Sequence, residues 1–299
     1  MKGLDIFSFQ ELWSPIFLFV MALLGIGYYY LIGPWRLKHA PEEARPTKFK
    51  QTLVVLGLLL FYLSQGGPLE LMGHLSFTFH MVNMSMSYLI VPPIMLLGIP
   101  AFVWRKVFAS ARWRSLQWAT HPFLALIGFN MLFSIYHVPM VHDYVMTHYA
   151  VHIVYYAVML LASFLMWWQI VSPVPEWKQM ADVRKMGYIF ANGVLLTPAC
   201  ALIIFSGAPL YNVYTDPTVW ATAMGYCVTG DPMKLLTLVE GPTAFSLMNP
   251  LEDQQAGGII MKLVQEVMYG AILAYVFNQW YRREHKDDEL PPSAEPSRL

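Results

Sequence analysis

Charged residues and cysteines are both scarce in this chain of 299 residues. Asp, Glu, Lys and Arg make up 13% of it, about half the share of roughly 25% that is usual in soluble globular domains, which excludes a soluble domain of ordinary composition. The only cysteines, Cys200 and Cys227, form no CxxC pair, which excludes a cysteine-based zinc motif and a disulfide-rich scaffold. We expect no disulfide between them, because Cys200 falls within a predicted helix.

Long hydrophobic runs are what the chain has in abundance. Hydrophobic residues make up 57% of it, and the mean hydropathy is +0.45. A helix that spans a membrane needs about 20 mostly apolar residues. Seven such runs predict an all-α, polytopic integral membrane helix bundle with seven transmembrane helices, over residues 14–33, 51–66, 73–98, 123–141, 149–171, 187–207 and 256–280.

The runs fill most of the chain, so we expect a single transmembrane domain over residues 1–281 and no separate soluble domain. Residues 282–299 are charged and contain prolines, which predicts a disordered cytoplasmic tail. The outer loop at 208–254 is long for a connection and carries Tyr211, Tyr214 and Trp220. So much apolar surface is unsuited to a solvated tether, and we expect this loop to fold over the outer mouth of the bundle, with a short interfacial helix.

Lys and Arg are distributed unevenly among the connecting segments. Of the 19 basic residues, 16 lie in one alternating set of segments, Lys2 and Lys234 lie in the opposite set, and Lys262 lies inside the last run. Basic loops stay in the cytoplasm, so the sequence predicts an amino terminus outside, a carboxyl terminus inside, and a multi-pass location in the cell (plasma) membrane. The formal net charge is zero, and no basic patch remains for nucleic acid.

Six of the nine histidines fall at the outer ends of the predicted spans, with methionines interleaved among them. Polar side chains are costly in hydrocarbon, so imidazoles at the ends of several helices call for a partner or a ligand. Imidazole and thioether together suit soft transition metals, copper above all. The histidines are His74, His80, His137, His142, His148 and His152.

Helical spacing selects the candidate metal ligands within this group. His80 and Met84 lie at i and i+4, as do His148 and His152, so each pair shares a helix face, and His137 ends the helix between them. We expect a copper site in the outer half of the membrane, with His142 outside it in the outer loop, in contact with water. The predicted ligands are His80, Met84, His137, His148 and His152, with His74 and Met81 as secondary candidates.

The last predicted helix carries a second polar group. Lys262 and Glu266, at i and i+4, should neutralise one another, since an unpaired charge at that depth costs about 2.5–3.5 kcal/mol or more. Two readings remain open, a structural ion pair and a proton- or ion-exchange element beside the cation site, with Asp253 at the start of the same helix as a further polar neighbour. Gly257 and Gly258 permit close helix approach.

Three stretches together resemble the CtaG family of assembly factors for caa3-type cytochrome c oxidase, the Bacillus-type CtaG. They are His80-Met81-Val82-Asn83-Met84 with Val91-Pro92-Pro93 through Ile99-Pro100; His137-Val138-Pro139 with His152 and Trp167-Trp168; and Asp253-Gln254-Gln255-Ala256-Gly257. The resemblance covers nearly the whole chain. The family pattern carries a second histidine where this chain has Asn83-Met84, which implies a thioether ligand and favours Cu(I).

The resemblance implies an assembly factor that is not an enzyme, with caa3-type oxidase subunits as partners. A site of His and Met near the outer surface suits a protein that receives copper from an outer-surface carrier and passes it on, in contact with membrane lipid. A scaffold for oxidase subunits without metal delivery is an alternative. Another is a haem-binding membrane redox protein with axial histidines. Lys262 and seven spans would suit a retinal protein, but residues 72–100 hold no carboxylate counter-ion.

Overall fold

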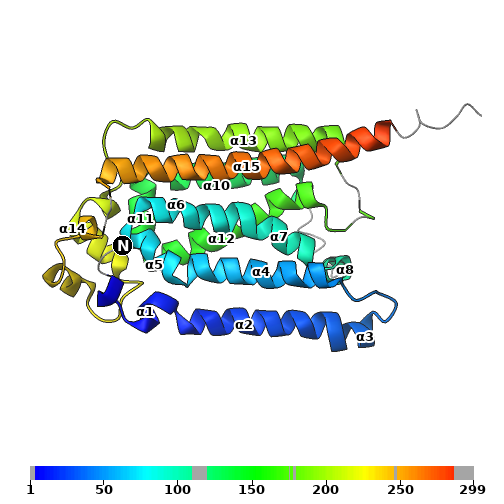
Figure 1. Cartoon of the computed structure of the whole chain (residues 1–299), viewed down its shortest axis with the longest axis horizontal. Helices are drawn as coiled ribbons and strands as arrows, with labels where there is room; N and C mark the ends of the chain where they lie inside the picture. Colours follow the sequence, from blue (N-terminus) through cyan, green and yellow to red (C-terminus); the bar gives the residue numbers. More distant parts are fainter. Residues whose placement is uncertain (1–3, 110–119, 175, 178–179, 246–247, 286–299) are drawn as a thin grey trace, which may run out of the picture.

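The computed structural model describes residues 4–109, 120–174, 176–177, 180–245 and 248–285, and the regular secondary structure of this part of the chain is all helical, without a strand. The long helices lie side by side along one axis (Figure 1). Their bounds are α2 Pro15–Tyr30, α4 Lys48–Gln65, α6 Phe77–Ser85, α7 Val91–Gly98, α10 Pro122–Tyr136, α12 Tyr149–Val171, α13 Asp182–Ile204 and α15 Pro250–Glu284.

Shorter helices join or cap these long ones. The π-helical turn η2 (Leu31–Trp35) continues α2, and the π-helical turn η3 (Met86–Ile90) joins α6 to α7. The short elements are η1 Leu4–Ile6, α1 Phe9–Trp13, η2 Leu31–Trp35, α3 Arg36–His39, α5 Pro68–Leu75, η3 Met86–Ile90, α8 Ala101–Ala109, α11 Pro139–Thr147, η5 Asn212–Tyr214, α14 Pro217–Met224, η6 Pro232–Thr237 and η7 Pro242–Ala244.

Proline marks where many of these helices begin. A proline at the first helical position loses no hydrogen bond, because that N–H has no partner within the helix, and its fixed φ suits the first turn. Six α-helices start in this way, at Pro15, Pro68, Pro122, Pro139, Pro217 and Pro250.

Six helical segments of the described chain are long and apolar enough to cross a membrane, and a seventh results if α10 and α11 form one broken span. The prediction of an all-helical chain with several apolar spans is confirmed. The six segments are Phe9–His39, Lys48–Leu75, Phe77–Gly98, Tyr149–Val171, Asp182–Ile204 and Pro250–Glu284.

The predicted third helix, 73–98, is broken near its start. Ser76 has an extended backbone (φ −150°, ψ 134°), so α5 ends at Leu75 and α6 begins at Phe77. His74 therefore belongs to α5 and does not share a continuous helix with His80. The predicted fourth helix also ends early, since α10 stops at Tyr136 and the chain turns by 82° into α11.

A buried carbonyl explains how the proline pair in the third span is tolerated. Pro92 has no N–H to donate to the carbonyl of Tyr88, four residues earlier. That oxygen instead accepts hydrogen bonds from Ser163 Oγ at 2.5 Å and from Trp167 Nε1 at 3.1 Å. Both donors lie on α12, so the Tyr88 carbonyl that Pro92 leaves free links the π-helical turn η3 to α12.

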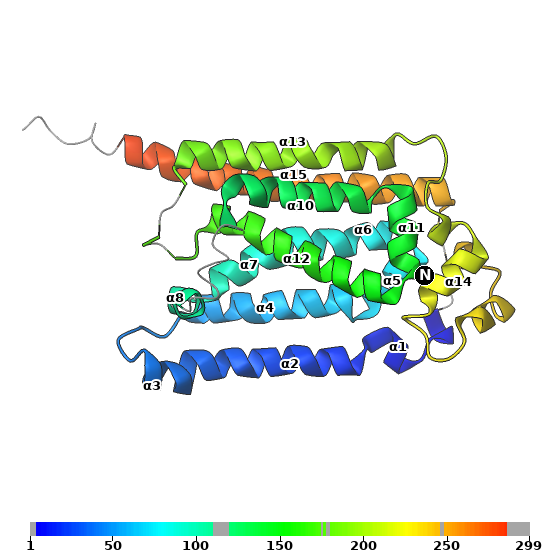
Figure 2. The same ribbon diagram turned by 180° about the vertical axis from the view of Figure 1, so that it is seen from behind.

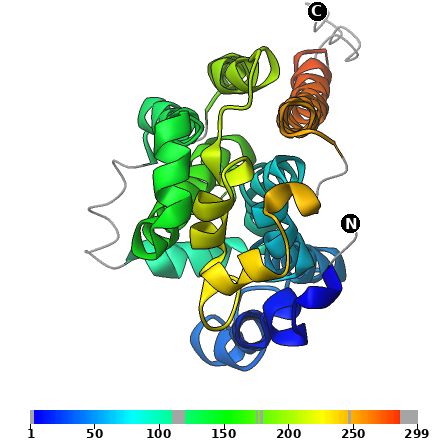
Figure 3. The ribbon, with the colours of Figure 1, turned by 90° about the vertical axis from the view of Figure 1, so that its left-hand side faces the viewer.

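The segment between α13 and α15 folds across one end of the bundle, as the loop prediction expected. It contains α14 and, seen end-on, crosses over the helices (Figure 3). Trp220, Leu235 and Phe245 are buried in one hydrophobic cluster with Leu71 and Leu75 of α5. We call residues 208–249 the cap, because α15 already begins at Pro250. At the other terminus α15 continues to Glu284, and residues 286–299 of the predicted tail lie outside the described residues.

The opposite end of the bundle carries the basic segments. The connection after α3 and the helix α8 lie there, far from α14 (Figure 2). Arg105 of α8 forms ion pairs with Glu43 and with Glu176, which belong to two different connections. The capped end and the basic end are therefore separated by the full length of the bundle.

Candidate metal centre

Five histidines from five different segments meet beneath the cap. His74 lies on α5, His80 on α6, His137 directly after α10, His142 on α11 and His152 on α12. The first four are at most 5% exposed, and His137 and His142 are fully buried. We call these five residues the histidine cluster.

The rings of the cluster lie close to one another. Ring centroids are 5.1 Å apart for His80 and His142, 6.4 Å for His80 and His137, and 6.0 Å for His74 and His152. With metal–nitrogen bonds of about 2.0 Å, two imidazoles that bind one ion hold their centroids roughly 5 to 6 Å apart. The spacing of His80 and His142 falls in this range, and that of His80 and His137 lies just above it. We call His80, His137 and His142 the deep triad, and His74 and His152 form a neighbouring pair.

Each ring of the cluster has a buried nitrogen without a hydrogen-bond partner. The Nε2 atoms of all five are in this state, as is Nδ1 of His142. In His137, Nδ1 donates to the carbonyl of Phe133 at 2.8 Å, and in His74 it donates to the carbonyl of Glu70 at 3.1 Å. Because a carbonyl can only accept, the proton of these two rings sits on Nδ1, and Nε2 presents a lone pair. This is the arrangement that metal-binding histidines use.

The prediction for His142 was wrong. We expected it in a water-exposed outer loop, but it lies on α11, fully buried between His80 and Tyr211. The reason is the turn at His137-Val138-Pro139. Pro139 restricts Val138 to an extended conformation, so α10 stops and α11 crosses beneath the cap at a steep angle, carrying His142 into the core.

The remaining predicted ligands are His148, Met81 and Met84. His148 is exposed, its ring stacks on Tyr144 with centroids 4.0 Å apart, and its Nδ1 donates to the Tyr144 carbonyl. The structure does not bring His148 into the cluster. Met81 and Met84 are both buried, at 0% and 1% exposure, and Met81 packs against Gly257 of α15.

Aromatic side chains of the cap hold the backbone around the histidines. The hydroxyl of Tyr211 donates to the carbonyl of His137 at 2.9 Å, and Trp220 Nε1 donates to the carbonyl of His74 at 3.2 Å. Asp143, next to His142, also holds the cap in place, because its carboxylate accepts hydrogen bonds from the backbone N–H groups of Asn212 and Val213. The sequence pointed to aromatic residues in this loop, but not to their partners.

Asp253 and the glycines after it position α6. The Asp253 carboxylate accepts hydrogen bonds from Ser76 Oγ and from the backbone N–H of Phe77, both at 2.7 Å. A Cβ atom on Gly257 would lie 2.8 Å from Cδ1 of Phe77 and 3.1 Å from its carbonyl oxygen. The close approach expected at Gly257 is therefore present, and it brings α15 against the helix that carries His80.

Lys262 and Glu266 form the ion pair that their spacing predicted, with Nζ and Oε1 2.7 Å apart. Lys262 Nζ also donates to Thr197 Oγ1 at 2.9 Å. The pair lines a cavity of about 190 Å³ between α13 and α15, with Tyr269 and Gly193. Both residues lie on α15, and the hydrogen bond from Lys262 to Thr197 links the pair to α13. No histidine of the described residues lines the cavity.

A sequence profile of the cytochrome c oxidase caa3 assembly factor family (CtaG) matches residues 28–283 of the chain. This range includes every histidine of the cluster and the whole cap. No curated protein and no solved structure is significantly similar to the chain.

Proposed function

This chain belongs to the cytochrome c oxidase caa3 assembly factor family, and we propose that it assists assembly by binding copper in the histidine cluster and delivering it to an oxidase subunit. In this proposal the chain is a binding protein and not an enzyme, and copper is its cargo. Its partners are the subunits of caa3-type oxidase and an outer-surface carrier that supplies the metal.

One observation carries the proposal, namely the five unpartnered Nε2 atoms beneath the cap. A buried nitrogen without a hydrogen bond costs about 1–3 kcal/mol, and a group of five such atoms is a large penalty for a fold to retain. Metal binding offsets part of that penalty, because the lone pairs of the ligands His80, His137 and His142 each gain a bond. Packing alone gives no reason for five segments to place imidazoles at the same depth.

The charge of the surroundings favours a monovalent ion. Burying an ion is costly unless opposite charge lies nearby, and this cost rises with the square of the ionic charge. The Asp143 carboxylate lies 3.7 Å from Nδ1 of His142 and provides one negative charge beside the triad. Imidazole binds copper and thioether ligands select Cu(I), so we propose His80, His137 and His142 as the ligands, with Met84, one turn from His80 on α6, as a candidate fourth.

We further propose that α10 and α11 together form one broken span, which gives seven, in the plasma membrane. The basic end faces the cytoplasm, as expected from the distribution of Lys and Arg. The cluster and the cap then face outward, with the amino terminus outside and the carboxyl terminus inside. An outward position suits exchange with an outer carrier.

The haem alternative is less favourable at this site. Aromatic rings surround the triad closely, with centroids 4.5 Å apart for Tyr211 and His142 and 5.7 Å for Tyr136 and His80. These tyrosine rings occupy the space that a porphyrin would need beside the imidazoles of His80 and His142. A Soret band in the purified protein would contradict the copper proposal.

Anaerobic Cu(I) binding by the purified full-length protein tests the proposal. We expect the wild type to retain copper against a competing chelator. The triple variant His80→Ala, His137→Ala, His142→Ala should lose the copper that the triad holds, whereas the exposed-histidine control His148→Ala should keep it. Affinity should fall as the pH is lowered, because protons compete with the metal for imidazole. Equal copper retention by the wild type and the triple variant would overturn the proposal.

A further inference from the structure

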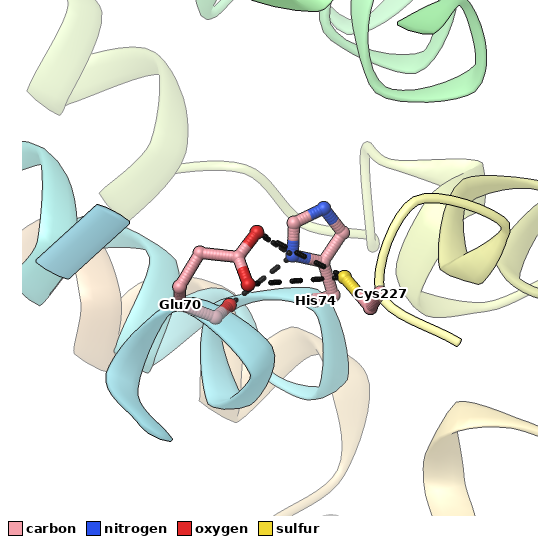
Figure 4. Close-up of side chains that lie close together, drawn as sticks. All are labelled: Glu70, His74 and Cys227. Carbon is pink, nitrogen blue, oxygen red and sulfur yellow. Dashed lines mark hydrogen bonds and ion pairs between the residues drawn. The ribbon is translucent and has the colours of Figure 1, made fainter. Parts of the chain in front are cut away.

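A second group of ligand-type side chains shares His74 with the histidine cluster. Glu70 and His74 of α5 meet Cys227 of the cap, and the side chains point toward one another (Figure 4). Their candidate ligand atoms all lie within 4.8 Å of one another. His74 Nδ1 is 3.6 Å from Glu70 Oε1, and Cys227 Sγ is 3.8 Å and 3.9 Å from the two oxygens of Glu70.

The fold brings this group together from distant parts of the sequence. Glu70 and His74 lie one turn apart on α5, and Cys227 is placed by the turn that follows α14, where its N–H donates to the Met224 carbonyl. Cys227 is 9% exposed and not in a disulfide. The Cys227 thiol donates toward the two carboxylate oxygens of Glu70, so the metal-free protein holds it as a thiol.

A cavity of about 850 Å³ reaches this group and one member of the histidine cluster. Glu70, Cys227, Tyr226 and His152 all line it, together with apolar residues of α2 and α12. His74 is 5% exposed and its Nε2 has no partner, and its ring lies 6.0 Å from that of His152. The group therefore lies between the cavity and the cluster.

We propose that Glu70, His74 and Cys227 form a loading site, which takes Cu(I) from the cavity and passes it through His152 to the deep triad. Thiolate is a soft ligand that favours Cu(I), and imidazole also binds copper. The inference rests on the proposed function, since the copper that is loaded is the copper that the triad holds.

The loading step keeps both atoms and charge in balance. The thiol must lose its proton to bind the metal, and the Glu70 carboxylate beside Sγ accepts it. His74 faces the group with Nδ1, so it binds in the tautomer that carries its single proton on Nε2. The products are a Cu(I)–thiolate bond and a neutral Glu70 carboxylic acid. The incoming positive charge and the carboxylate charge cancel, so the buried group is neutral once loaded. Transfer to His152 reverses the step, since the proton returns to Cys227 as the copper leaves.

Copper–thiolate absorption in the ultraviolet tests the loading site, because imidazole and thioether ligands do not produce it. Full-length protein is titrated anaerobically with Cu(I) in the presence of a competing chelator. We expect the wild type and Cys200→Ser to show the band, and Cys227→Ser to lack it and to bind one ion fewer. Glu70→Gln should weaken this site by about tenfold, as removal of a neighbouring hydrogen-bonding group does elsewhere, whereas the exposed control Glu240→Gln should match the wild type.

Two further variants separate this inference from the proposed function. The triple triad variant should keep the thiolate band while losing the histidine-bound copper. In Cys227→Ser the triad should fill to the same final level, but several-fold more slowly. If saturated wild type lacks the band while the triad still holds copper, the loading site is wrong and the proposed function stands. Zn(II) binding at Cys227 without Cu(I) binding there, or an unchanged filling rate in Cys227→Ser, would also overturn the inference.

Discussion

The carboxylate of Asp253 caps the helix that carries His80, with its Oδ2 atom 2.7 Å from the backbone nitrogen of Phe77, 176 positions away in the sequence. The first N–H groups of a helix have no partner within it and need an acceptor, and a negative charge there also favours the helix dipole. Ser76, which precedes α6, is extended and its own side chain donates to Asp253. The start of α6 therefore depends on a residue of α15.

Replacement of Asp253 by alanine should destabilise the protein and loosen its copper site. The change leaves the Phe77 N–H and the Ser76 hydroxyl without their acceptor, at a cost of about 1–3 kcal/mol for each buried group. Thermal unfolding of the detergent-solubilised protein should shift to a lower temperature, and the affinity for Cu(I) should fall. Glu252→Gln, a change at the exposed neighbouring carboxylate, is the control, and an equal melting temperature for the two variants would contradict this role of Asp253.

The buried and the exposed histidines should behave differently in cells. His80→Ala, His137→Ala and His142→Ala should each lower caa3 oxidase activity under copper limitation, while the amount of the assembly factor in the membrane stays near that of the wild type. Each span keeps its apolar surface and its backbone hydrogen bonds, so function should suffer more than folding. His148→Ala should match the wild type, since His148 is exposed and stacks on Tyr144.

Added copper distinguishes a weakened site from a misfolded chain in the same experiment. A variant with lower affinity should regain part of its oxidase activity at higher copper by mass action, whereas a misfolded variant should not. Normal oxidase activity in all three buried-histidine variants under copper limitation would leave the scaffold alternative as the better account.

The helices could be predicted because the signals that specify them are local. Runs of apolar residues and the prolines at helix starts lie within a few positions of the elements they determine. Six of the seven predicted runs overlap helical segments that are long and apolar enough to cross a membrane, and the remaining run overlaps α10 and α11. The same apolar runs predicted that His80, His137 and His152 lie at one end of their helices. Lys262 and Glu266 could be paired because i and i+4 are neighbours on any helix.

The parts that could not be predicted depend on contacts between distant segments. The break at Ser76 needs the Asp253 carboxylate, and the burial of His142 needs both the turn at Pro139 and the cap residue Tyr211. Cys227 and Glu70 lie 157 positions apart, and nothing near either residue indicates the other. The periodic spacing of residues in a sequence predicts which side chains share a face of a helix, but it does not predict which loop packs on that face.

The orientation of the chain can be measured with single cysteines at the two ends of the bundle. Thr222 of the cap and Ala44, between α3 and α4, are both exposed. In a background with Cys200→Ser and Cys227→Ser, a membrane-impermeant maleimide should label Thr222→Cys in intact cells and should label Ala44→Cys only after the membrane is opened. This outcome is expected because basic connections remain on the cytoplasmic side. Labelling of Ala44→Cys alone in intact cells would reverse the proposed topology.

Neutralising one member of the Lys262–Glu266 pair should do more harm than neutralising both. The side chains are 28% and 61% exposed on the surface of the bundle, at a depth that faces lipid if α15 spans the membrane. Lys262→Met leaves an unpaired carboxylate there, which costs about 2.5–3.5 kcal/mol on insertion scales. The double variant with Glu266→Gln removes both charges, so its melting temperature and abundance should recover toward the wild type. Lys234→Met, in the exposed part of the cap, is the matched control. If the single and double variants are equally stable, the pair does not neutralise a charge within the membrane.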